Sequence, residues 1–243
     1  MTDIVNWPHF DPLPRASIFD VDGTLISGTT TFFFAELLRA KGLVEPSYLF
    51  RMAYHGLQHR FGRLDYGRLL AFGLSHIRSI PMIELEKLAV ENFENQVRPR
   101  LFQGVIEHCQ GLRESGVKLV LLSSSPEFIL RPLGDFLGAS AIISTPMRIE
   151  DGKIEGPLAG PACYGPGKRA YAERWAVSEG LAMDDCVAYA DNWSDRSLLL
   201  RTGRAVVVNP RGRLLRLARR EGWLIVRPKK ASRSLRSKPN RGT

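Results

Sequence analysis

The sequence has few of the features that mark secreted or membrane-spanning proteins. Its 243 residues include only three cysteines, Cys109, Cys163 and Cys186, at unrelated spacings. An odd number of scattered cysteines favours neither a disulfide framework nor a thiolate metal site, and it fits a reducing compartment. No segment approaches the roughly 18 apolar residues of a membrane span, and the first fifteen residues show no targeting pattern. We therefore expect a cytoplasmic, globular protein.

Acidic residues are missing from the C-terminal segment. From Arg227 onward the chain has seven Lys or Arg residues and no acid, so the rest keeps only +2 of the net charge of +9. Such a segment buries little apolar surface, so residues 227–243 are predicted to form a basic, disordered tail. A solubilising end is favoured over a nucleic-acid-binding arm. Weak peripheral contact with an anionic membrane is the alternative.

The order of apolar runs and helical patterns favours a parallel sheet. Buried strands are predicted over Ala16–Phe19, Val117–Leu122, Ala141–Ser144, Cys186–Ala190 and Ala205–Val208. Helical patterns that end at a glycine cover Leu101–Ser115, Pro126–Leu137, Lys168–Glu179 and Arg211–Glu221. This alternation predicts an α/β fold with a doubly wound parallel sheet, in which ligands bind at the carboxyl ends of the strands.

Two segments interrupt the alternation. Residues 27–100 have no strand run but carry apolar residues at helical spacing, so we expect a helical domain inserted after the first strand. Residues 1–26 and 101–226 would then form the α/β core. Residues 147–154 alternate in polarity around Asp151-Gly152, which is typical of a β-hairpin, and we expect it to form a peripheral flap.

Two aspartates follow the first predicted strand, in the sequence Asp20-Val21-Asp22-Gly23-Thr24. The strand period of two points both carboxylates toward the same edge of the sheet. Two like charges at this separation need compensation, and Mg²⁺ is the usual ion where a substrate brings a phosphate. An ordinary Asx turn, in which both aspartates merely cap a loop, is the alternative.

Later strand ends add groups suited to phosphate. Ser123-Ser124-Ser125 follows a strand and precedes a helix, which suits phosphate binding by a hydroxyl and free backbone N–H groups, although simple N-capping fits as well. Lys168 begins another helix and could neutralise phosphate charge, although a lysine in such a loop is usually solvated. Asp191 follows the strand Cys186–Ala190, with Asp195 four residues later.

In combination, these four strand-end elements resemble the motifs of the haloacid dehalogenase superfamily. Within it, the chain is most similar to the phosphoserine-phosphatase-like branch, which carries a helical cap after the first strand. The resemblance spans about Ala16 to Val226. It implies a Rossmann-like core, a helical cap over residues 27–100, and a Mg²⁺-dependent phosphoric monoester hydrolase.

The resemblance also implies a role for each residue. Asp20 would be the nucleophile that forms an aspartyl-phosphate, and Asp22 the general acid and base. Ser123, the backbone N–H of Ser124 and Lys168 would hold the phosphate. Mg²⁺ would be bound by the Asp20 carboxylate, the Asp22 carbonyl and Asp191, with Asp195 in support.

The substrate is less well defined by the sequence. Phosphoserine phosphatases have a Glu nine residues after the nucleophile that recognises the substrate amine, whereas this chain has Thr29 there. Residues 48–78 carry five Arg and three His against one Asp, which favours a small or amphiphilic anionic phosphate monoester, a lipid headgroup phosphate included. Phosphotransfer through the same aspartyl-phosphate and a non-catalytic binding protein are the alternatives. Nothing in the sequence fixes the oligomeric state.

Overall fold

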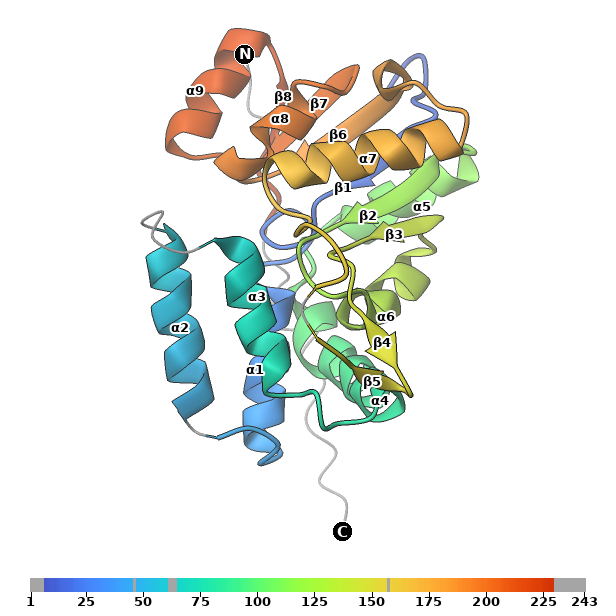
Figure 1. The fold of residues 1–243 in the computed structure, drawn as a ribbon. Helices are drawn as coiled ribbons and strands as arrows, with labels where there is room; N and C mark the ends of the chain where they lie inside the picture. Colours follow the sequence, from blue (N-terminus) through green and yellow to red (C-terminus); the bar gives the residue numbers. More distant parts are fainter. Residues whose placement is uncertain (1–6, 46, 61–64, 157, 230–243) are drawn as a thin grey trace.

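A six-stranded parallel sheet forms the centre of the molecule. The computed structural model describes residues 7–45, 47–60, 65–156 and 158–229, without the side chains of residues 53 and 55–60. The strand order is β3-β2-β1-β6-β7-β8, so the order reverses on either side of β1 (Figure 1). The strands are β1 (Ala16–Phe19), β2 (Lys118–Leu122), β3 (Ala141–Ile143), β6 (Cys186–Ala190), β7 (Arg204–Val208) and β8 (Leu224–Val226). The predicted doubly wound sheet is confirmed, with β8 as an additional edge strand.

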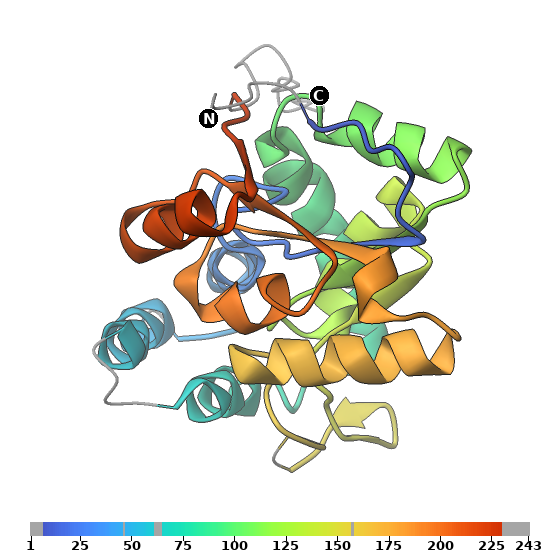
Figure 2. The same ribbon diagram turned by 90° about the horizontal axis from the view of Figure 1, so that it is seen from above.

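Helices cover both faces of the sheet because successive strand residues point to opposite sides. Phe19 and Tyr189 face the layer that contains α5 (Val105–Glu114) and α6 (Glu127–Leu137). Ile18 faces the opposite layer. Figure 2 shows the sheet between the two helical layers. That layer contains α7 (Pro166–Ser178), α8 (Arg196–Leu199) and α9 (Gly212–Glu221). Each face thus has its own apolar core.

The core helices lie close to their predicted positions. The largest difference is at α5, which begins at Val105 rather than Leu101. Gly104 precedes the helix with φ 80°, a left-handed conformation that interrupts helical geometry at this point. The short helix α8 was not predicted, because its four residues are too few to show a helical period.

The segment between β1 and α5 is helical. It contains α1 (Thr30–Ala40), α2 (Ser47–Arg60), α3 (Tyr66–Ser75), α4 (Met82–Asn92) and a π-helical turn at Phe93–Val97. Side chains from α1, α3 and α4 form a third apolar cluster, which also includes Phe128 and Ile129 of α6. The helical region therefore packs directly against α6, one of the helices that cover the sheet. Its division from the core as a separate cap stays a prediction.

The expected hairpin comprises β4 (Ile149–Glu150) and β5 (Lys153–Ile154), which pair in antiparallel fashion. Both turn residues, Asp151 and Gly152, have positive φ, at 48° and 71°. The hairpin is less peripheral than expected, because Ile154 is buried in the apolar cluster of the helical region.

The predicted tail is described only at its start. Residues 227–229 are tied to the core, since the backbone N–H of Gln103 donates to the carbonyl of Lys229 at 3.0 Å. The rest of that prediction, residues 230–243, lies outside the described residues. Within the part of the chain that the structure describes, no helix is long and apolar enough to cross a membrane.

Candidate active site

Asp20 lies directly beyond the carboxyl end of β1. Its backbone N–H donates to the carbonyl of Tyr189 at 2.9 Å, which continues the pairing of β1 with β6 by one residue. The carboxylate is buried and accepts two hydrogen bonds. Lys168 Nζ donates to Oδ1 at 2.6 Å, and Thr24 Oγ1 donates to Oδ2 at 3.1 Å. Both oxygens of Asp20 are thus held in fixed positions.

Asp22 lies in the turn after Asp20, with its side chain directed toward the helical region. Its Oδ1 accepts from the backbone N–H of Thr30 at 2.8 Å, at the start of α1. Ser125 Oγ donates to Oδ2 at 3.4 Å. The strand ends at Phe19, so the period of two that we extrapolated through Asp22 does not apply in the turn. The two carboxylates therefore have separate partners.

Gly23 allows the turn to pass close to β6. Its φ is 86°, and a Cβ built there would lie 2.2 Å from Asp191 Oδ2. Any side chain at this position would displace the Asp191 carboxylate. The glycine of the Asp20–Thr24 motif thus makes room for the third acid of the site.

The serines after β2 line the same edge of the sheet. Ser123 is buried, and its Oγ accepts from the backbone N–H of Ser125 at 3.1 Å. The carbonyl of Ser124 accepts from Thr145 Oγ1 at 3.0 Å. Ser125 Oγ hydrogen-bonds to the hydroxyls of Thr30 and Thr31, each at 2.8 Å. This loop therefore connects the sheet edge to the start of α1.

Lys168, at the start of α7, links two of the acids. Its buried ammonium lies 2.6 Å from Asp20 Oδ1 and 3.0 Å from Asp195 Oδ1. Oxygens of Asp20, Asp191 and Asp195 come within 4.8 Å of one another. We call these three aspartates together with Lys168 the acidic cluster. The structure thus brings Lys168, predicted from a loop, into direct contact with the predicted nucleophile.

The charges of the acidic cluster are not balanced. Burial, followed by the charges of Asp20 and Asp195, raises the pKa of Asp191. Burial likewise raises the pKa of Asp195 against the opposing effect of Lys168. Burial alone would lower the pKa of Lys168, but Asp195 and Asp20 raise it well above its ordinary value. One ammonium therefore faces three carboxylates in a buried space.

The acidic cluster fits a hard divalent cation. Asp195 Oδ2 is buried and has no hydrogen-bond partner among the residues that the structure describes, which is costly for a carboxylate oxygen. Carboxylate oxygens are the ligands that Mg²⁺ prefers, and two further positive charges would balance the cluster. Asp22 contributes no side-chain oxygen to the group of three aspartates. Its predicted contact with Mg²⁺ would therefore be made by its backbone carbonyl.

Two tyrosines that we did not single out from the sequence also reach the site. The hydroxyl of Tyr66, in α3, hydrogen-bonds to the Ser124 side chain. Its ring stacks on Tyr164, with centroids 4.6 Å apart and an angle of 6° between the planes. Burial raises the pKa of Tyr66 to about 12, so its hydroxyl stays protonated at neutral pH. Neither tyrosine follows a predicted strand, so the pattern of polar residues at strand ends did not indicate them.

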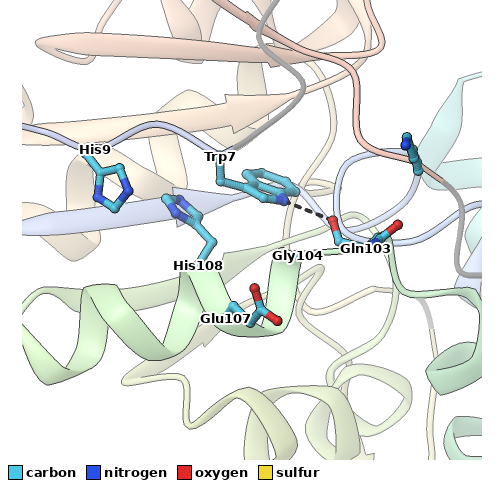
Figure 3. Close-up of a pocket in the computed structure, with 7 residues that line it drawn as sticks. Trp7, His9, Gln103, Gly104, Glu107 and His108 are labelled. Carbon is cyan, nitrogen blue, oxygen red and sulfur yellow. Dashed lines mark hydrogen bonds between the residues drawn. The ribbon is translucent and has the colours of Figure 1, made fainter.

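A separate cavity of about 470 Å³ lies at the start of α5 (Figure 3). Figure 3 shows the rings of Trp7 and His108 side by side, and they stack with centroids 5.1 Å apart. None of the residues that line this cavity belongs to the acidic cluster. Of the three His in residues 48–78, His76 hydrogen-bonds through Nδ1 to Ser75 and to the carbonyl of Phe72. The side chains of His55 and His59 lie outside the description.

Comparisons with known proteins place these features in a family. A family model described as haloacid dehalogenase-like hydrolase matches residues 18–200. Phosphoserine phosphatase SerB1 of Mycobacterium tuberculosis is 29% identical over 217 residues, which cover 88% of this chain and 70% of that protein. Histidinol-phosphatase of Neisseria meningitidis is 27% identical over 221 residues, which cover 88% and 99% respectively.

A solved structure shares the fold. The crystal structure of a protein with unknown function from Bordetella pertussis superposes with a TM-score of 0.82 and 24% identity, covering 88% of this chain and 99% of that one. The predicted fold class and the predicted enzyme class, a phosphoric monoester hydrolase, are both confirmed by these comparisons. The chain belongs to the haloacid dehalogenase-like hydrolases.

Proposed function

We propose that this protein hydrolyses a small phosphate monoester through an aspartyl-phosphate formed on Asp20. The observation that carries the proposal is the 2.6 Å contact between Asp20 and Lys168 inside a buried group of three carboxylates. A carboxylate fixed beside an ammonium and a cation site is suited to attack on phosphorus, since positive charge must compensate the equatorial oxygens. Sequence relatives that are named phosphatases support this assignment.

In the first half of the reaction, an Asp20 oxygen attacks phosphorus and the bond to the leaving oxygen breaks. Asp22 protonates that oxygen, so the alcohol departs neutral. Burial raises the pKa of Asp22 to about 6, against the opposing effect of the Thr30 N–H. A carboxyl with this pKa is partly protonated near neutral pH, which suits a general acid.

In the second half, the ionised Asp22 removes a proton from water as the water oxygen attacks phosphorus. The bond between phosphorus and Asp20 breaks, inorganic phosphate leaves, and both aspartates return to their starting states. Covalent catalysis thereby divides one difficult displacement into two easier ones. The hydrogen bonds from Thr30 and Ser125 keep the Asp22 carboxyl in one position throughout.

The remaining residues of the site would bind phosphate and metal. Ser123, the backbone N–H of Ser124 and Lys168 would contact the phosphate oxygens. Asp20 and Asp191 would hold Mg²⁺ together with the Asp22 carbonyl, with Asp195 adjacent to them. When bound, Mg²⁺ supplies positive charge against the phosphate oxygens.

The substrate is a small or amphiphilic anionic phosphate ester. One relative is named for phosphoserine and another for histidinol phosphate, so related chains accept different alcohols. Thr29 stands where the resemblance expects a Glu for the serine amine, which argues against phosphoserine. We place the reaction in the cytoplasm, because all three cysteines are buried and unpaired.

The test replaces Asp20 by Asn, which keeps the shape and removes the nucleophile. Hydrolysis of an alkyl phosphate with Mg²⁺ should fall by about 10³- to 10⁶-fold, as expected for loss of a covalent nucleophile. Release of inorganic phosphate and of phosphorylated acceptor alcohol are measured together, because a phosphotransferase would yield the second product. The control is Asp135→Asn, an exposed aspartate on α6. Equal rates for Asp20→Asn and the wild type would disprove the assignment.

A further inference from the structure

Tyr66, in α3, interacts with groups that are assigned to the reaction. Its hydroxyl bonds to the Ser124 side chain, and it interacts electrostatically with both Asp22 and Lys168. Asp22 is the assigned acid, and Ser124 and Lys168 are the assigned phosphate contacts. The Tyr66 hydroxyl therefore lies beside the position where phosphate and leaving oxygen would meet.

The local structure of α3 fixes Tyr66 in this position. Asp65 caps the helix, with its Oδ1 accepting from the backbone N–H groups of Gly67 at 2.8 Å and Arg68 at 3.3 Å. Tyr66 is thus the first residue of α3. A Cβ at Gly67 would lie 3.8 Å from Ala162 Cβ, so the helix start lies against the loop that precedes α7 (Figure 1).

The residue before Tyr164 is linked to the same serine through Thr145. The hydroxyl of Thr145 donates to the carbonyl of Ser124 at 3.0 Å and accepts from the backbone N–H of Cys163 at 2.9 Å. Tyr164 follows directly, and its ring stacks on Tyr66. Two segments far apart in the chain therefore converge on Ser124 and bring one aromatic ring each.

Tyr66 and Tyr164 are half-buried residues whose rings contact each other. An aromatic surface beside the general acid is suited to contact a leaving group with a flat apolar ring, since such contacts favour ring partners over aliphatic ones. A protonated phenol can also donate to the ester oxygen, whose negative charge grows as the bond to phosphorus breaks.

We propose that Tyr66 and Tyr164 form the leaving-group subsite of this enzyme, and that they select phosphate esters of ring-bearing alcohols. The Tyr66 hydroxyl contacts the phosphate end, which all substrates share, and the two rings contact the alcohol. This inference rests on the proposed function of Asp20 and Asp22, and it concerns the substrate rather than the chemistry at phosphorus.

The experiment compares 2-phenylethyl phosphate with n-butyl phosphate, whose alcohols are of similar acidity. In Tyr66→Phe, kcat/KM should fall by about tenfold for both esters, mainly through kcat, because one hydrogen bond to the shared phosphate end is lost. In Tyr164→Leu, kcat/KM should fall by about tenfold for the phenylethyl ester alone, mainly through KM, because a ring contact is lost. Tyr164→Phe should keep the wild-type preference.

The control is Tyr171→Phe, which removes a hydroxyl that donates to the carbonyl of Pro161 at 2.7 Å in the same part of the fold. Its kcat and KM should stay within twofold of the wild-type values, because the change lies outside the proposed subsite. Wild-type kinetics in Tyr66→Phe, or equal losses on both esters in Tyr164→Leu, would overturn the inference. The proposed function would fall separately, if Asp20→Asn retained activity.

Discussion

The acidic cluster lies beyond the carboxyl ends of β1 and β6. On the face of these strands that α5 and α6 cover lies an aromatic cluster, which comprises Trp7, Phe19, His108 and Tyr189. In the aromatic cluster, His108 Nε2 hydrogen-bonds to Tyr189 Oη at 2.9 Å. The Phe19 and Tyr189 rings stack with centroids 4.0 Å apart. Burial, with a smaller effect of His9, lowers the pKa of His108 to about 4, so this imidazole is neutral near pH 7.

Burial favours the uncharged form of the ionisable groups in both clusters, but only the acidic cluster holds more acids than cations. The aromatic cluster contains an imidazole that is neutral, and His108 Nε2 and Trp7 Nε1 each hydrogen-bond within the protein. The acidic cluster holds three carboxyl groups against the single ammonium of Lys168, and within the described part of the chain Asp195 Oδ2 has no hydrogen-bond partner. Burial of unbalanced charge is costly unless a ligand compensates it. The imbalance therefore identifies the acidic cluster as the functional one, although the cavity of about 470 Å³ lies beside the aromatic cluster.

The comparison can be tested most strongly at Lys168. Replacing it by Met removes the cation of the acidic cluster and leaves three buried carboxylates together. Without divalent metal, the free energy of unfolding should fall by about 3–5 kcal/mol, as expected when one partner of a buried ion pair is removed. Urea unfolding in the presence of a chelator measures this loss.

The matched control is Lys41→Met, which breaks an exposed ion pair with Glu91 whose charged atoms lie 2.7 Å apart. This change should cost less than about 1 kcal/mol, because solvent already screens the pair. Similar losses in both variants would show that Lys168 is not the cation on which the acidic cluster depends.

Residues at the strand ends could be predicted from the sequence, whereas residues of the helical insertion could not. Asp20, Ser123 and Asp191 each follow an apolar run, and parallel strands end at one edge, so their proximity follows from the alternation of elements. Lys168 was predicted instead from its place after a Gly/Pro loop, at the start of a helix. These residues need only the topology of the sheet to come together.

Tyr66 and Tyr164 could not be found in this way. Tyr66 reaches the site only because α1, α3 and α4 pack on α6 through the third apolar cluster. Helical periodicity shows which face of a helix is apolar, but not which surface it packs against. Likewise, β8 was missed because its three residues form too short a run to separate from the helix end at Gly222.

A second prediction concerns the missing positive charge. Mg²⁺ should raise the free energy of unfolding of the wild type by about 2.7 kcal/mol at a concentration one hundred times its Kd. Asp191→Asn should lose most of this gain. In chelator, the same variant should be more stable than the wild type, because burial and neighbouring carboxylates disfavour the ionised Asp191.

Thermal or urea unfolding with Mg²⁺, and with NaCl at equal ionic strength, separates specific binding from screening. The control is Asp184→Asn, an exposed acid that pairs with Arg201 at 3.1 Å. It should respond to Mg²⁺ as the wild type does. An Asp191→Asn variant that keeps the full Mg²⁺ effect would remove Asp191 from the cation site.

The smallest expected effect belongs to the aromatic cluster. The pKa of His108 is lower in the folded protein than the ordinary value of 6.5, so the unfolded chain binds a proton first as the pH falls. Stability should therefore decrease on acidification. Between pH 7.5 and pH 5, His108 should account for about 2 kcal/mol of the decrease in the free energy of unfolding. Its contribution should level off as the pH approaches 4.

His108→Gln isolates this contribution, because an amide can still hydrogen-bond to Tyr189 but does not titrate in this range. The difference in unfolding free energy between wild type and variant, measured by urea denaturation at both pH values, should change by about 2 kcal/mol. If the His108→Gln variant loses as much stability on acidification as the wild type, His108 is not a buried neutral imidazole. The aromatic cluster could then no longer be described as uncharged, in contrast to the acidic cluster.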